Sequence, residues 1–168
     1  VYLDTDVELL RPFGDLLELS GFAGFEDAEH VATCVLGAEK EHGFFRQAME
    51  LYEGRTFLRE GGEPDLTTNV EILTGLLGRN GLEPDGARQS VMGMEIFPAE
   101  YFSPRSLETG KLTKTGNTYA IHWFEASWQT GSQRFHRKVA QVIGKKNTER
   151  LKKLLGRSGG PESSGRSG

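Results

Sequence analysis

The run Val1-Tyr2-Leu3-Asp4-Thr5-Asp6 places two acidic side chains directly after an apolar segment that we expect to be a buried strand. Open α/β sheets bind their ligands at the carboxyl ends of strands, so a site is expected here. Carboxylates at i and i+2 of an ideal strand share a face and can approach one hard cation. Oxygen ligands favour Mg²⁺ or Mn²⁺ over zinc, because Cys34 alone offers no sulfur cluster. On its own, an Asp-x-Asp also fits a polar strand end that faces solvent.

Two chemistries use an Asp-x-Asp at a strand end. One aspartate can attack a phosphoryl group, or both can serve a metal ion that neutralises charge on a departing diphosphate. A phosphatase with an aspartate nucleophile is expected to have Thr or a small residue soon after the second Asp, and a later acidic pair after an apolar strand. Here Val7-Glu8 follows Asp6, and the sequence has no such pair. The metal interpretation is favoured, and the phosphatase is the weaker alternative.

Hydrophobic spacing predicts mixed strands and helices, and therefore an α/β fold. Strands are expected at residues 1–3, 22–25, 31–38, 91–97 and 119–123, although 31–38 also fits a helix. Helices are expected at residues 13–19, 44–58 and 70–77. Gly43 is expected to break the chain before the second helix. Thr67 or Thr68 is expected to cap the third helix at its N-terminus, and Gly78 and Gly81 to end it.

Composition predicts one globular domain without a membrane span. The chain has 168 residues, of which 36% are hydrophobic, and ten Phe can contribute to a core. No apolar run is long enough to cross a bilayer. The single cysteine, Cys34, excludes an internal disulfide, fits a reducing compartment and is expected to be a core side chain.

Charge divides the chain unevenly. Residues 134–168 carry ten Lys/Arg and two Glu, whereas residues 1–133 carry ten Lys/Arg and twenty-two Asp/Glu. The basic part predicts an amphipathic helix at 134–156, followed by a disordered Gly/Ser-rich tail at 157–168. A packed helix with a solvated cationic face is the commoner use of this pattern, and peripheral contact with an anionic membrane is the other. We expect no nucleic-acid partner and a cytoplasmic location, with the membrane contact on the inner face.

A second motif lies downstream, where Tyr119-Ala120-Ile121-His122-Trp123-Phe124-Glu125-Ala126-Ser127-Trp128 combines an apolar strand with a His, an acid, a Ser and two Trp. Together with the Tyr2–Asp6 segment, it resembles the DXD-containing sugar-binding-region glycosyltransferases. That group includes capsular-polysaccharide transferases and Golgi mannosyltransferases and is related to the large glucosylating toxins. The resemblance covers most of residues 1–130, including segments 24–27, 37–42, 67–74 and 96–102.

This resemblance implies a GT-A (Rossmann-like) fold, a nucleotide-sugar donor, Mn²⁺ or Mg²⁺, and retaining transfer of a hexosyl group to a glycan or lipid-linked acceptor in polysaccharide or glycan synthesis. It implies a role for each of several residues by position. Asp4 and Asp6 would be the catalytic and metal-binding pair, His122 would complete the metal site, Ser127 and Trp128 would contact the donor, and Thr68 and Glu39 would bind substrate. Glu26 and Asp27 are further acids that a solvated turn explains equally well.

The sequence departs from the family pattern at two places. Many relatives have two consecutive His where His122 is followed by Trp123, and Gly-Pro where this chain has Thr68-Asn69. The segment that supplies the base and ribose pocket of a GT-A fold would precede Val1. We therefore expect residues 1–133 to be the C-terminal part of a GT-A domain lacking its N-terminal strands, with an exposed sheet edge and weak donor binding. The alternative is a degenerate transferase that binds carbohydrate without catalysis.

Overall fold

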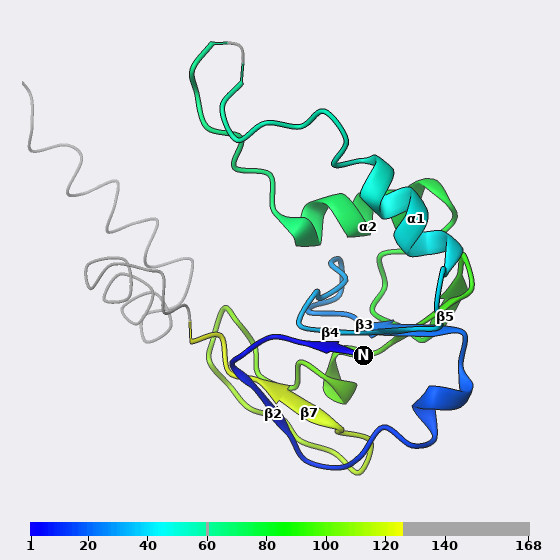
Figure 1. Ribbon diagram of the computed structural model, residues 1–168. Helices are drawn as coiled ribbons and strands as arrows, with labels where there is room; N and C mark the ends of the chain where they lie inside the picture. The colour runs from blue at the N-terminus through cyan, green and yellow to red at the C-terminus, as the bar shows by residue number, and fades with distance from the viewer. Residues whose placement is uncertain (60, 126–168) are drawn as a thin grey trace, which may run out of the picture. The chain divides into compact units, whose positions relative to one another are not determined.

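The computed structural model describes residues 1–59 and 61–125, and a five-stranded mixed sheet organises them (Figure 1). The strands follow the order β1-β4-β3-β6-β5, in which only β3 and β6 run parallel. Their bounds are Tyr2–Leu3 for β1, Gly21–Gly24 for β3, Val35–Ala38 for β4, Gln89–Val91 for β5 and Met94–Phe97 for β6. A separate antiparallel pair, the β2–β7 ribbon, joins Val7–Leu9 to Ala120–His122. The expected mixed α/β content is confirmed.

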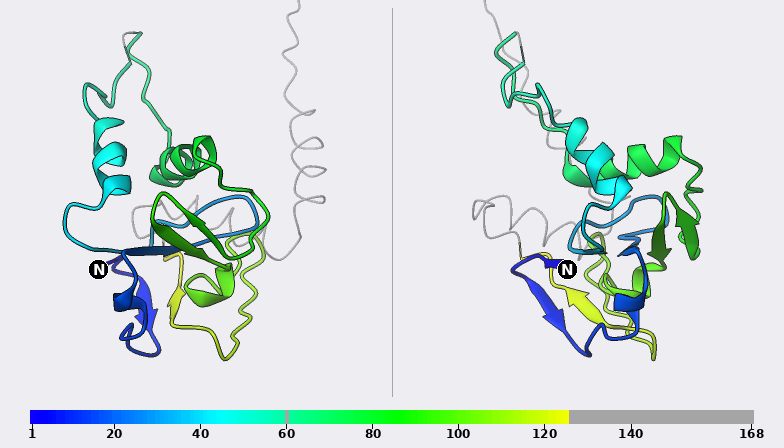
Figure 2. Two further views of the ribbon diagram at one scale, coloured as in Figure 1. Left: turned by 90° about the vertical axis from the view of Figure 1, so that its right-hand side faces the viewer. Right: turned by 45° about the vertical axis from the view of Figure 1, so that its right-hand side comes forward.

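The sheet carries helices on one face and the β2–β7 ribbon on the other (Figures 1 and 2). Helix α1 spans Gly43–Glu50 and α2 spans Asn69–Arg79. Two 3₁₀ turns, η1 at Leu16–Glu18 and η2 at Ala99–Tyr101, complete the elements of the described chain.

Alternation along the strands builds one core on each face of the sheet. In β3, Ala23 joins the helix-side core while Phe22 joins the other, because successive side chains of a strand point to opposite faces. In β6, Ile96 and Phe97 divide in the same way. The second core is aromatic: Phe13 packs at ring-centroid distances of 5.7 to 6.0 Å from Phe22, Phe102 and Tyr119.

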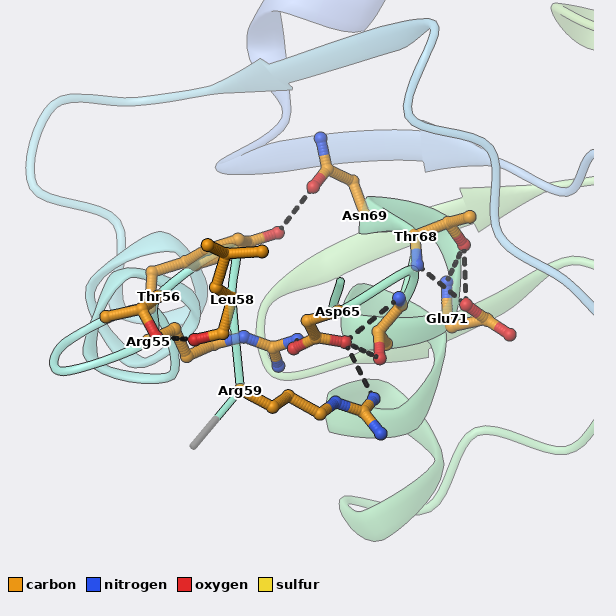
Figure 3. A network of polar contacts seen from close by, with 10 residues as sticks. Arg55, Thr56, Leu58, Arg59, Asp65, Thr68, Asn69 and Glu71 are labelled. Atoms are coloured by element: carbon orange, nitrogen blue, oxygen red, sulfur yellow. Dashed lines mark hydrogen bonds and ion pairs between the residues drawn. The ribbon is translucent and has the colours of Figure 1, made fainter. Parts of the chain in front are cut away.

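Helix α2 begins as the sequence indicates, and α1 does not. Thr68 and Glu71 form a reciprocal capping box at the start of α2 (Figure 3). At α1, Gly43 opens the helix instead of breaking the chain, because the His42 side chain caps it by accepting a hydrogen bond from the Phe44 N–H. The helix expected over 44–58 ends at Glu50, and the following turns include Gly54 at a positive φ of 73°. The end of α2 passes through Gly78 to Arg79, before Gly81.

Three strand and helix expectations need correction. Residues 13–19 form only η1, since so short a segment without a side-chain cap does not sustain an α-helix. Residues 91–97 form the β5–β6 hairpin instead of one strand, because Met92 and Gly93 have positive φ of 54° and 78° and reverse the chain. The strand β1 is exposed instead of buried, at the edge of the described sheet, with Tyr2 55% exposed.

The other expected elements are confirmed or lie outside the described residues. The ambiguous segment 31–38 contains strand β4, and 119–123 contains β7. The predicted helix at 134–156 and the predicted tail at 157–168 fall outside the described part. Within that part, no helix is both long and apolar enough to cross a membrane.

Candidate metal centre

Asp4 and Asp6 lie in a tight turn between β1 and β2. The Asp4 N–H still donates to the Cys34 carbonyl (2.9 Å), which extends the β1–β4 pairing by one residue. The chain then reverses, and the Val7 N–H donates to the Asp4 carbonyl (3.2 Å). The expectation that both acids stand on one face of an ideal strand is therefore wrong in its geometry, because the turn, and not strand alternation, determines their positions.

The turn nevertheless directs both carboxylates toward His122, at the end of β7. The β2–β7 register pairs Val7 with His122, so the imidazole lies beside the residue that follows Asp6. His122 Nε2 is 3.3 Å from Asp6 Oδ1 and 3.9 Å from Asp4 Oδ2. One ligand atom from each of the three residues lies within 4.8 Å of the others. Two ends of the described chain thus supply one cluster, made of the three residues for which the resemblance implies a metal-binding role.

The second oxygen of each aspartate is held by a hydrogen-bond donor. The Tyr2 hydroxyl donates to Asp4 Oδ1 (2.6 Å), and the Glu125 N–H donates to Asp6 Oδ2 (2.7 Å). The hydrogen bond to Asp4 raises the pKa of Tyr2 above its ordinary value. These donors fix each carboxylate so that its remaining oxygen faces His122. Hydrogen-bond donors around metal sites commonly orient the metal-binding side chains in this way.

Position 123 faces away from the cluster. The Trp123 indole N–H donates to Glu8 Oε2 (2.9 Å), and Arg105 donates to the Trp123 carbonyl and places its guanidinium 5.7 Å from the indole ring. In the β2–β7 register Glu8 pairs with Ile121 and Val7 with His122, so the bond to Glu8 places the Trp123 side chain on the face opposite to His122. The His-to-Trp departure from the family pattern therefore leaves the three-residue donor set intact.

The donor set suits a divalent cation of the Mn²⁺ or Mg²⁺ type. Two carboxylate oxygens are the ligands that such hard ions prefer, and the imidazole nitrogen favours a first-row transition metal over Mg²⁺. The Asp4, Asp6 and His122 side chains are 31%, 22% and 13% exposed, so the cluster is partly shielded but open to a ligand from solvent. Among the described residues, no other group of three His, Cys, Asp or Glu side chains meets in this way.

The other residues singled out in the sequence lie elsewhere. Thr68 caps α2 on the helix side of the sheet, and the exposed Glu39 follows the end of β4 that is remote from Asp4. Ser127 and Trp128 are outside the described residues. Cys34 is buried, as expected, beside Ser103, and burial raises the pKa of its thiol to about 12. The Asp27 carboxylate accepts hydrogen bonds within its own turn, from the Glu29 and His30 N–H groups.

Tyr2 and the Glu125 N–H are the contributors that sequence reasoning missed. Tyr2 stands two residues before Asp4, a spacing that places both side chains on one face of an extended chain and could have identified it. Comparison with known proteins adds no family, because no family model, curated protein or solved structure matches the chain. Function is therefore inferred from the arrangement of Asp4, Asp6 and His122.

Proposed function

We propose that this protein is a retaining, metal-dependent glycosyltransferase of the GT-A type that moves a hexosyl group from a nucleotide-sugar to a hydroxyl of a glycan or lipid-linked acceptor. The convergence of Asp4, Asp6 and His122 within 4.8 Å carries the proposal. It joins the two motifs on which the family resemblance depends, although they lie at opposite ends of the described chain. The mixed sheet with helices is compatible with the α/β class to which a GT-A fold belongs.

In the proposed mechanism, Asp4, Asp6 and His122 would hold the cation. When bound, Mn²⁺ or Mg²⁺ neutralises negative charge on the leaving nucleoside diphosphate. Tyr2 and the Glu125 N–H keep the two carboxylates oriented before substrate arrives, so little reorganisation is needed at the moment of reaction.

Retention fits attack of the acceptor hydroxyl on the face from which the diphosphate departs. In that geometry a departing phosphate oxygen accepts the acceptor proton, and no separate protein base is required. The aspartates contribute through charge and position, since each has one oxygen engaged by a donor and one directed toward His122.

Calorimetric titration with Mn²⁺, followed by GDP or UDP in the presence and absence of the ion, tests the proposal. We compare Asp6→Asn, which removes one ligand charge, with Glu18→Gln, which removes the same charge at an exposed position on η1. We expect Mn²⁺ binding that Asp6→Asn weakens at least about tenfold and Glu18→Gln leaves unchanged, and nucleotide binding that requires the ion.

Other outcomes would overturn it. If the wild type binds no Mn²⁺, or if both substitutions weaken binding equally, the cluster is not a metal site. Metal binding without metal-dependent nucleotide binding would favour the non-catalytic alternative. A covalent phosphate on Asp4 or Asp6 after incubation with a phosphoryl donor would favour the phosphatase.

A further inference from the structure

A cleft of about 340 Å³ lies away from the metal cluster. Its lining includes Arg11 and Tyr119, which come together where the Leu10 and Arg11 N–H groups donate to the Tyr119 carbonyl (2.8 and 3.3 Å). This contact lies beyond the Leu9–Ala120 pair, whereas Asp6 and His122 lie at the other end of the β2–β7 ribbon. Tyr119 lies three residue steps before His122, or roughly 10 Å along an extended chain. The cleft is therefore a separate site.

Two guanidinium groups lie on a row of stacked aromatic rings in this cleft. Phe97 stacks on Tyr101 at 4.7 Å between ring centroids, and Tyr101 stacks on Tyr119 at 6.1 Å. The Arg88 guanidinium lies 4.7 Å from the Phe97 ring centre, and the Arg11 guanidinium lies 3.5 Å from that of Tyr119. Cation–π contacts hold both cations in place.

Several polar groups of the lining retain hydrogen-bonding capacity. Arg88 donates from Nε to Glu95 (3.0 Å), and its two Nη groups have no hydrogen-bond partner among residues 1–59 and 61–125. Over the same residues, the Tyr101 hydroxyl is also without a partner. Arg11 reaches the carbonyls of Gly116 and Asn117 only at 3.3 and 3.4 Å, near the limit of a hydrogen bond.

Among the lining residues, Arg11 and Arg88 are cationic and Asp15 is the one carboxylate, while Glu95 beside the cleft is ion-paired with Nε of Arg88 (3.0 Å). The Tyr119 hydroxyl donates to the Asp15 carboxylate and lowers its pKa, so Asp15 is ionised at neutral pH and its charge is partly satisfied. Leu16 and Leu19 provide an apolar wall. A ligand that fits this surface combines an anionic group for the Nη groups of Arg88 with hydroxyls for Tyr101, Asp15 and Asn117.

We propose that this cleft binds an anionic monosaccharide, that is, a sugar that carries a carboxylate or a phosphate. Guanidinium groups recognise both anions with paired, charge-assisted hydrogen bonds. The volume is near the lower end of the range for small-ligand sites, about 300 to 1,000 Å³, and suits one sugar unit. The site does not depend on the metal cluster, so its existence and the proposed transferase activity stand or fall separately.

Titration of the ¹⁵N-labelled protein with glucuronate, glucose 6-phosphate and neutral glucose, without added metal, tests this inference. Arg88→Gln removes one guanidinium, and Tyr101→Phe removes only a hydroxyl while it keeps the ring stack. Arg79→Gln, at the exposed end of α2, is the matched loss of one positive charge outside the cleft. Unfolding midpoints equal to the wild type show that a variant is folded.

We expect saturable shifts of cleft resonances with one or both anionic sugars, and much weaker ones with glucose. Arg88→Gln should raise the dissociation constant at least about tenfold, as the loss of a hydrogen bond to a charged group implies. Tyr101→Phe should raise it less, and Arg79→Gln should not change it. If the dissociation constants of glucuronate and glucose 6-phosphate differ, the tighter ligand shows whether the cleft prefers a carboxylate or a phosphate. No saturable binding, equal binding of glucose, or equal weakening by Arg88→Gln and Arg79→Gln would overturn the proposal.

Discussion

Trp123 donates its indole N–H to Glu8 at 2.9 Å, on the face of the β2–β7 ribbon opposite to His122. This pair shows which of two adjacent positions can serve the cluster of Asp4, Asp6 and His122. For the side chain at position 123 to bind a metal ion in this cluster, it would have to give up its hydrogen bond to Glu8 and cross to the other face of the ribbon.

The first prediction follows from that orientation. Trp123→His should leave the Mn²⁺ dissociation constant within about twofold of the wild type, whereas His122→Ala should raise it at least about tenfold. Calorimetric titration at pH 7.5 measures both. Stronger Mn²⁺ binding by Trp123→His would show that position 123 can reach the cluster and that our account of its orientation is wrong.

The hydroxyl of Tyr2 is expected to affect metal affinity without contributing to the fold. Tyr2→Phe removes the 2.6 Å hydrogen bond to Asp4 but keeps the ring, which is 55% exposed. We expect Mn²⁺ binding to weaken about tenfold, the lower end of the effect of outer-shell partners, with no change in the urea midpoint. Tyr52→Phe, on another exposed tyrosine, is the control. Equal affinities of Tyr2→Phe and the wild type would remove Tyr2 from the site.

Thr68 is expected to matter for stability through its cap. Thr68→Ala removes the acceptor for the Glu71 N–H and should lower the free energy of unfolding by about 1 kcal/mol. Urea denaturation measures this change. Thr68→Ser, which keeps the hydroxyl, should recover most of it. If Thr68→Ala leaves stability unchanged, the capping box contributes nothing measurable to α2.

Acid should weaken the same cap. The Thr68 N–H and hydroxyl donate to Glu71 and lower its pKa, and donation from the Thr67 hydroxyl and from Arg59 lowers that of Asp65 (Figure 3). Because the folded pKa values lie below the unfolded ones of about 4, the stabilisation is complete above that pH and is lost as the pH falls through the folded values.

The pH effect can be assigned to Glu71 with one substitution. Urea unfolding is compared between pH 7 and pH 3. At pH 7, Glu71→Gln should have a lower free energy of unfolding than the wild type, and the difference between the two free energies should decrease as the pH falls. Glu18→Gln should not show this convergence, since Glu18 lies exposed on η1. Parallel curves for Glu71→Gln and the wild type would contradict the assignment.

Close packing at Gly37 predicts a large effect of one methyl group. A Cβ there would lie 2.1 Å from Cε1 of Phe22, a buried ring of the aromatic core. Gly37→Ala should destabilise the fold by about 1 to 3 kcal/mol, as overpacking does. Gly43→Ala is the matched control, because its Cβ would meet no atom within 4 Å at the start of α1. Thermal unfolding compares the two, and equal midpoints would show that β3 and β4 separate easily.

Local signals in the sequence predicted several elements well. The cap expected at Thr67 or Thr68, the strand expected at 22–25 and the apolar run that becomes β7 are all short-range patterns; the structure places the cap at Thr68 and confirms both strands. The same kind of signal failed where backbone geometry decides. The positive φ at Met92 and Gly93 divides one expected strand into a hairpin, and helix α1 ends before its apolar spacing does.

The sequence by itself determined the chemistry available to this protein: two acids after an apolar segment and a histidine at the end of another. Only the tertiary structure decided that they meet, because pairing of β2 with β7 depends on contacts between segments far apart in the chain, which local periodicity does not encode. The same holds for the cleft, where Arg88, Tyr101 and Arg11 come from three separate segments. Residue types limit the reactions a chain can perform, and packing determines which of those residues act together.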